Sequence, residues 1–196
     1  MERLSLITGL VVRQQKEWGE ILLNFETKNR YVISDESEKY LYLAVEKASS
    51  VLSRYFLGAY RPFQIFVLSE GNNIVLRIVR SFRFYFHHLE VIDSRGKLLG
   101  VIERRFSLLH RVYSVFNASG AEIYRLDSPL LSPWTFQIKN GEIDYGKIKK
   151  KWSGLLKEGF TDTDNFGVVF PAEWDIKLKA LFLGAVFLID FVHFEK

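Results

Sequence analysis

The sequence predicts a mostly β protein in which antiparallel strands surround one buried C-terminal helix. Residues 180–189 form an unbroken apolar run with no polar stripe at helical spacing, which is typical of a helix that is buried on every face. Upstream, turn-forming clusters recur about every 20 residues, the spacing of β-hairpins. Hydrophobic residues make up 48% of the 196 residues, and 17 are Phe. This is enough for a large core, and we expect one domain over residues 1–196.

The strands are expected to form hairpins. Residues 1–23 begin with either a β-strand or a helix around residues 14–23, and the pattern does not separate the two. Residues 24–46 alternate on both sides of a polar Ser/Asp/Glu segment, which predicts a hairpin. Further turns are predicted at Glu70–Asn73, Asp93–Gly96, Asn117–Gly120 and Asn140–Gly141.

Two stretches, residues 61–109 and 111–152, resemble each other. The matching pairs are Phe63 with Tyr113, Ile65 with Val115, Gly100 with Gly146, Ile102 with Ile148 and Phe106 with Trp152. Two such copies predict similar meanders that form the halves of one antiparallel sheet or barrel, which has no exposed edges once it closes.

The terminal helix, expected over residues 176–194, fits burial in protein better than burial in lipid. A bilayer-spanning helix needs about 20 apolar residues, and here charged residues interrupt the run on both sides. A charge at bilayer depth costs about 2.5 to 3.5 kcal/mol. We therefore expect the strands to enclose this helix, Asp175 to cap its N-terminus and Asp190 to find a partner within the barrel or at its mouth.

Composition excludes several classes of function. The chain has no cysteine, which excludes disulfides, thiolate catalysis and cysteine-ligated zinc. No histidine pair has metal-ligand spacing, and no nucleophile elbow or phosphate loop is present, so we do not expect an enzyme. The net charge of +4 is compatible with an anionic membrane partner, and we expect no nucleic-acid partner. The N-terminus lacks the pattern of a signal peptide, so a cytoplasmic location is expected.

Residues 146–196 carry the motifs W-x-G, FTDxDxFG, FP, D-x-K-x-KA and LGAxFLIDFxxFE in that order. In this order they resemble the C-terminal region of the phospholipid scramblase family, and NFETKNRY, RPF and LLGVI extend the resemblance to about residues 20–196. The resemblance implies a tubby-like closed antiparallel β-barrel of about twelve strands around a buried hydrophobic C-terminal helix. The family's cysteine clusters and proline-rich tail are missing here, which excludes anchoring through thioesters.

The resemblance also implies a function. It implies calcium-responsive, ATP-independent movement of phospholipids in both directions between membrane leaflets, by a peripheral protein at the inner face of the plasma membrane. The alternative is a soluble tubby-like module that binds lipid headgroups or a protein partner and does not move lipids.

Residues 162–173 are the candidate calcium segment. On a twelve-position calcium loop the candidate positions are 1, 3, 5, 7 and 12, occupied by Asp162, Asp164, Phe166, Val168 through its carbonyl, and Glu173. The side chains of Phe166 and Phe170 offer no oxygen, so we expect an affinity no better than about 10⁻⁴ to 10⁻³ M. The family resemblance also implies calcium binding here. In the alternative interpretation the two Asp residues shape a turn and the two Phe residues pack inward.

Two basic stretches are candidates for contact with an anionic lipid surface. Residues 80–88 interleave Arg80 and Arg83 with aromatic residues, a composition found at membrane interfaces. The alternative is a half-buried strand with Phe82, Phe84 and Phe86 facing the core. The second stretch follows Lys147 and comprises Lys149, Lys150, Lys151 and Trp152; it fits a solvated strand edge, lipid contact or an import signal.

Overall fold

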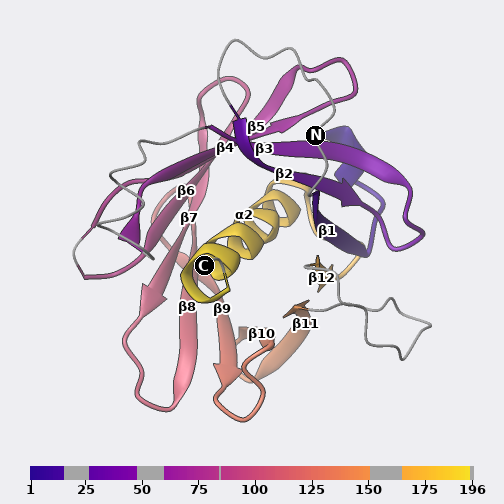
Figure 1. Ribbon diagram of the computed structural model, residues 1–196. Helices are drawn as coiled ribbons and strands as arrows, with labels where there is room; N and C mark the ends of the chain where they lie inside the picture. Colours follow the sequence, from indigo (N-terminus) through magenta and orange to yellow (C-terminus); the bar gives the residue numbers. More distant parts are fainter. Residues whose placement is uncertain (16–26, 48–59, 84, 151–164, 195–196) are drawn as a thin grey trace.

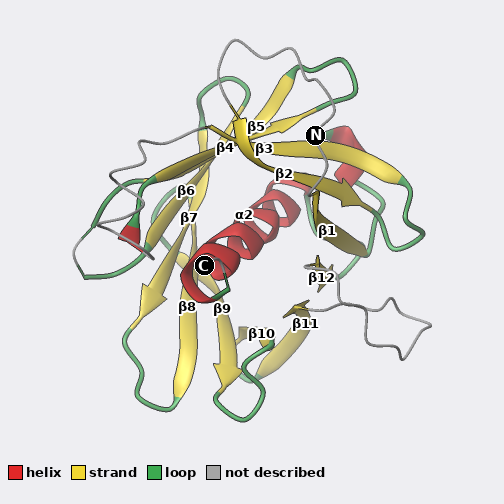
Figure 2. Cartoon of the chain, in the orientation of Figure 1, coloured by secondary structure: helices red, strands yellow, loops and turns green. Residues whose placement is uncertain are grey.

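The computed structural model describes residues 1–15, 27–47, 60–83, 85–150 and 165–194. Within these ranges twelve strands form a closed barrel in which every strand is antiparallel to both neighbours, and β1 pairs with β12 to complete the ring. One α-helix, α2 (Ile176–His193), runs through the middle of this ring (Figures 1 and 2). The short 3-10 helix η1 (Glu2–Leu4) precedes the strands β1 (Gly9–Gln15), β2 (Thr27–Ser34), β3 (Tyr40–Lys47), β4 (Phe63–Leu68), β5 (Ile74–Arg80), β6 (His88–Asp93), β7 (Leu98–Arg105), β8 (His110–Asn117), β9 (Glu122–Pro129), β10 (Thr135–Asn140), β11 (Ile143–Lys150) and β12 (Asn165–Val169).

The predicted hairpin turns are confirmed. The hairpin expected over residues 24–46 is β2 and β3, and the four further turns join β4 to β5, β6 to β7, β8 to β9 and β10 to β11. Asp93 and Asn117 each accept backbone N–H groups two and four residues further on. This side-chain contact is why Asp and Asn mark such turns in the sequence.

The internal repeat is a repeat of four strands. The first copy contains β4 to β7 and the second contains β8 to β11. Phe63 in β4 and Tyr113 in β8 are both buried at matching positions, as are Ile102 in β7 and Ile148 in β11. The last predicted pair does not extend the pattern into the core, because Phe106 is exposed after β7. Its counterpart Trp152 lies outside the described residues.

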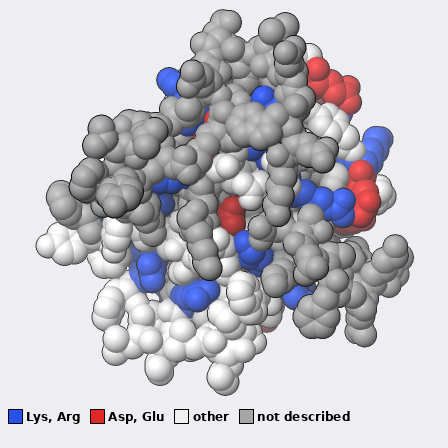
Figure 3. Space-filling model, viewed as in Figure 1, with Lys and Arg blue, Asp and Glu red and all other residues white. Residues whose placement is uncertain are grey.

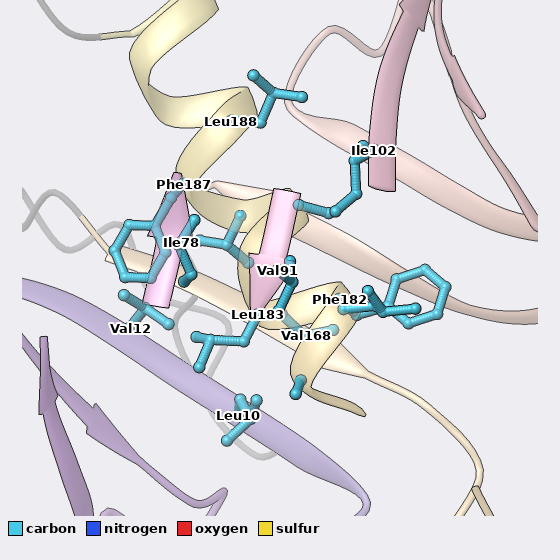
Figure 4. Packing of buried hydrophobic residues seen from close by; sticks show 14 of the residues in the cluster. Leu10, Val12, Ile78, Val91, Ile102, Val168, Phe182, Leu183, Phe187 and Leu188 are labelled. Atoms are coloured by element: carbon cyan, nitrogen blue, oxygen red, sulfur yellow. The ribbon is translucent and has the colours of Figure 1, made fainter. Parts of the chain in front are cut away.

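The barrel encloses α2, as predicted. Every residue of α2 from Lys179 to Phe191 is buried. Figure 4 shows helix side chains such as Phe182 and Phe187 among residues from several strands, including Val91 and Ile102. None of the described helices is long and apolar enough to cross a membrane.

The N-terminal end of α2 is fixed by two side chains. Asp175 caps the helix as predicted, with its carboxylate accepting the N–H of Leu178 at 2.7 Å. Lys179 is fully buried, and its Nζ donates to three backbone carbonyls at 2.9 Å each; the carbonyls are those of Ser5, Ile7 and Ala172. Burial lowers the pKa of this ammonium group. Lys179 therefore ties α2 to the segment that leads into β1.

Candidate functional site

The two ends of the barrel differ in construction. At one end, called the turn end here, short turns join β2 to β3, β4 to β5, β6 to β7, β8 to β9 and β10 to β11. At the other, the loop end, lie the connections β5–β6, β7–β8 and β9–β10 and the C-terminus of α2. Most of the residues proposed from the sequence for lipid contact lie in or next to the loop end.

Beneath the loop end, Lys150 and Asp190 form a buried ion pair. The Nζ of Lys150 lies 3.4 Å from Oδ1 of Asp190 and 4.4 Å from the ring centre of Phe194. The prediction that Asp190 finds a partner is confirmed. The expectation that Lys150 contacts lipid or solvent is wrong, because strand alternation points it inward with Ile148.

Arg80 is also buried, so its predicted lipid contact is wrong. It follows Leu76 and Ile78 on the inner face of β5, and its guanidinium hydrogen-bonds Nδ1 of His87. Burial, with the charges of Arg80 and Arg104, lowers the pKa of His87 to about 4. The imidazole is therefore neutral at physiological pH, when it can accept a hydrogen bond from the guanidinium.

A second neutral histidine lies at the end of α2. Nε2 of His193 is 2.7 Å from the hydroxyl of Tyr113, a fully buried residue of β8. Burial, together with the charges of Arg111 and Arg104, lowers the pKa of His193 to about 3. The same burial raises the pKa of Tyr113, which keeps the phenol protonated. This contact fastens the C-terminal end of the helix to the barrel wall.

A fourth buried polar contact joins Glu46 and Arg61 and was not predicted from the sequence. Glu46 at the end of β3 is fully buried and pairs with Arg61 at 2.5 Å. Its other oxygen accepts from Asn29 at 2.7 Å. The guanidinium carbon of Arg61 lies 4.6 Å from the ring centre of Phe191. The signal in the sequence was the position of Glu46 two residues after the inward-facing Ala44.

The stretch after Arg80 is not the strand that its alternation predicted. Residues 81–83 and 85–87 lie between β5 and β6 outside the ladder, and Phe82, Tyr85 and Phe86 are exposed. Arg83 is exposed with them. Phe84 lies outside the described residues. The core assignment of Phe82 and Phe86 is therefore wrong, and membrane contact by Arg83 stays a prediction.

Two further apolar loops at the same end were not singled out from the sequence. The β7–β8 connection exposes Phe106, Leu108 and Leu109, and the β9–β10 connection exposes Leu130, Leu131 and Trp134. The available signal was a cluster of large apolar residues directly beside turn-forming Ser and Pro.

The lysines of β11 divide between the two faces of the strand. Lys147 and Lys149 are exposed on the outer face, opposite in direction to Lys150. The strand is not an edge, because it pairs with both β10 and β12. Lipid contact by Lys149 stays a prediction, and Lys151 and Trp152 lie outside the described residues.

The calcium segment is described only in its second half. Asp162 and Asp164 lie outside the described residues. Phe166 and Val168 belong to β12, which pairs with β1 and β11, and both are buried. Glu173 is exposed in the turn before α2. Phe166 and Val168 therefore do not fit an open coordination shell, and the described residues contain no group of three acidic or histidine side chains that fits a metal ion.

Comparison with known proteins identifies the family. The scramblase family model matches residues 1–196. The whole chain is similar to phospholipid scramblase 2 of Bos taurus (32% identity, 71% of that protein), phospholipid scramblase 1 of Mus musculus (33%, 64%) and phospholipid scramblase 1 of Homo sapiens (31%, 65%). An X-ray structure of an Arabidopsis thaliana protein aligns with 94% of this chain and 91% of its own, with a TM-score of 0.47 and 14% identity. The chain belongs to the scramblase family.

Proposed function

We propose that this protein moves phospholipids in both directions between the leaflets of a membrane, without ATP and in response to calcium. The single observation that carries the proposal is the match of the scramblase family model to all 196 residues. We place the protein at the inner face of the plasma membrane as a peripheral protein, with anionic phospholipid as its partner and a protein partner as a further possibility. The proposal involves no covalent chemistry on the lipid.

Calcium dependence is proposed for the segment before β12. The sequence offers two carboxylates before the strand, Asp162 and Asp164, and an exposed one beyond it, Glu173. Carboxylate oxygens are the ligands that calcium prefers. Five extended residues of β12 lie between the two Asp residues and Glu173, a span of about 16 Å. One calcium ion would therefore take its carboxylate ligands from Asp162 and Asp164 and not from Glu173.

A second candidate function is a module that binds the membrane surface and does not move lipids. The enclosure of α2 favours it. The most apolar segment of the chain packs against the barrel wall along its length, so its side chains do not contact lipid while the barrel is closed. Surface binding requires no opening of the barrel, whereas a lipid path along this helix does.

The two candidates differ in a liposome assay. Liposomes that carry a fluorescent phospholipid are reconstituted with the protein and treated with a membrane-impermeant quencher in millimolar calcium. Movement between leaflets predicts quenching beyond the outer-leaflet share, whereas a surface-binding module predicts a plateau at that share.

The calcium proposal is tested with the double variant Asp162→Asn/Asp164→Asn. It should lose the calcium response, while the matched control Asp144→Asn, an exposed acid on β11, should keep it. Equal calcium responses in the double variant and the unmodified chain would remove the site.

A further inference from the structure

The three connections at the loop end all expose apolar side chains. They comprise the described residues of 81–87 together with residues 106–109 and 130–134, and we call them the apolar loops. Consecutive antiparallel strands reverse direction, so alternate connections of the barrel meet at one end. The face shown in Figure 3 has an area without charged side chains at its lower edge, where Figure 1 shows the ends of β8 and β9.

The apolar side chains of these loops are strongly exposed. Tyr85 is 87% exposed, Leu108 80% and Leu131 98%. Phe106, Leu109 and Leu130 are more than half exposed as well. Exposed apolar residues that occur singly need no explanation, but several of them on connections that meet at one end of a barrel indicate an interaction site.

The turn end has the opposite composition. Its turns are built from Asp, Glu, Asn, Ser and Gly, as in Asp35–Glu38 and Asp93–Gly96. The large apolar side chains exposed there, among the described residues, are Leu6, Ile74 and Ile143, which come from separate segments. The apolar loops contain no Asp or Glu. The described residues at the two ends of the barrel therefore differ in polarity.

Hydrogen bonds and ring stacking hold the apolar loops against the barrel. The backbone N–H of Arg104 in β7 donates to the carbonyl of His87 at 2.8 Å. Arg111 in β8 donates through Nη1 to the carbonyl of Pro133 at 3.0 Å. Trp134 stacks on Phe194 with ring centres 5.1 Å apart. These contacts fix the loops before they bind a partner, which lowers the conformational entropy lost on binding.

The charged side chains in and beside the apolar loops favour an anionic partner. Arg83 is exposed within the apolar loops, and Arg111 is half-buried beside them. The nearby carboxylates of Glu103 and Asp127 lie within ion-pair distance of Arg105 and His110. Among the described residues, these loops combine aromatic side chains with Arg83 and contain no Asp or Glu, which matches the headgroup region of an anionic bilayer.

We propose that the apolar loops dock the barrel on a bilayer containing anionic phospholipid, with their apolar side chains in the interfacial region. This inference rests on the proposed function and specifies the surface through which it acts. A bilayer fits better than a second copy of the chain, because a stable dimer needs a continuous, complementary surface of about 1,200 to 2,000 Å². Separate loops with protruding side chains enter a soft interface without that complementarity.

Site-specific labelling tests the docking surface directly. The chain has no cysteine, so Leu131→Cys and Ile143→Cys each accept one environment-sensitive nitrobenzoxadiazole label. Ile143 is the matched control, because it is apolar and 60% exposed but lies at the turn end. With vesicles of phosphatidylcholine and phosphatidylserine, emission from position 131 should rise severalfold and shift to shorter wavelengths, while emission from position 143 stays unchanged. Vesicles of phosphatidylcholine alone should give a weaker response.

Binding of variants provides the second measurement. Leu108→Glu/Leu131→Glu should bind the anionic vesicles at least about tenfold more weakly, because two apolar side chains that enter the interface are replaced by charges. Ile143→Glu should bind like the unmodified chain.

Three results would overturn the docking proposal. The first is a response at position 143 equal to that at 131, and the second is a response at 131 that needs only higher protein concentration and no lipid. The third is the absence of vesicle binding. Lipid movement is measured separately by quenching, so vesicle binding through another surface with normal lipid movement would overturn the docking surface and leave the proposed function standing.

Discussion

At the scale of single residues, strand alternation decides which charged side chains are buried. Arg80 continues the inward positions of Leu76 and Ile78, and Lys150 continues that of Ile148. The alternation of inward and outward positions was visible in the sequence. Both residues were nevertheless predicted to contact lipid, because each lies close in sequence to other basic residues. His87, the partner of Arg80, lies across a loop, and Asp190, the partner of Lys150, is distant in sequence. No local pattern identifies either partner.

Lys179 is expected to contribute strongly to stability. Lys179→Met removes an ammonium group that satisfies the carbonyls of Ser5, Ile7 and Ala172. Leaving these part-buried carbonyls without the ammonium donor should lower the free energy of unfolding by about 1 to 3 kcal/mol. Urea unfolding of the variant measures the change.

The control for this prediction is Lys177→Met, since Lys177 lies on the exposed side of the same turn. It should change the free energy of unfolding by no more than about 0.5 kcal/mol. Similar effects of the two substitutions would contradict the role assigned to the carbonyl contacts.

The two neutral histidines predict a loss of stability in acid. Their pKa values fall from an ordinary 6.5 to about 4 for His87 and about 3 for His193. At a pH between the pKa of a histidine in the folded protein and its ordinary pKa, that histidine binds a proton only in the unfolded chain. The free energy of unfolding therefore falls as the pH falls through this range. From pH 7 to pH 5 the free energy of unfolding should drop by about 1 to 2 kcal/mol per histidine.

Urea midpoints measured between pH 5 and pH 7 test this prediction. The double variant His87→Gln/His193→Gln is less stable at pH 7 because its contacts are lost, but its stability should depend much less on pH. If the stability of the double variant depends on pH as strongly as that of the unmodified chain, the acid sensitivity comes from groups other than these two histidines.

At the scale of elements, the packing of α2 on β6 depends on a glycine. A Cβ at Gly184 would lie 2.5 Å from Cγ2 of Val91, closer than such carbon atoms approach. Ala is favoured over Gly within helices by about 1 kcal/mol. The close approach should outweigh this preference, and Gly184→Ala should lower the free energy of unfolding by about 1 to 3 kcal/mol.

A double-mutant cycle separates this contact from other effects. Val91→Ala removes the contacting methyl group, so Gly184→Ala should be less destabilising in that background. Additive effects of the two substitutions on the free energy of unfolding would show that helix and strand do not meet as closely as described.

The hairpins could be predicted from the sequence, whereas the apolar loops could not. Turns such as Asn117–Gly120 carry local signals, because the Asn side chain bonds its own backbone and Gly120 has a φ of +83°. The residues after Arg80 alternate as a strand does, but pairing of β5 with β6 begins only at Val79 with Glu90. The end of a ladder is set by long-range pairing, which local alternation does not encode.

At the scale of the whole molecule, barrel closure explains both the buried helix and the polarity of the ends. β1 pairs with β12, so the ring is complete and α2 fills its interior. The length of the apolar run predicted that the helix is enclosed, and the resemblance to the scramblase family implied the closed barrel of about twelve strands. The convergence of the apolar loops at one end follows from strand order, which became visible only with the register of all twelve strands.

Because the closed ring surrounds α2, we expect the helix to stay inside the barrel while the protein acts on membranes. The most direct test is a disulfide between Gly184→Cys and Val91→Cys, positions that nearly touch, in a chain without other cysteines. The oxidised and reduced proteins should bind anionic vesicles equally and move lipids at the same rate. Loss of either property on oxidation, with recovery on reduction, would show instead that the helix leaves the barrel.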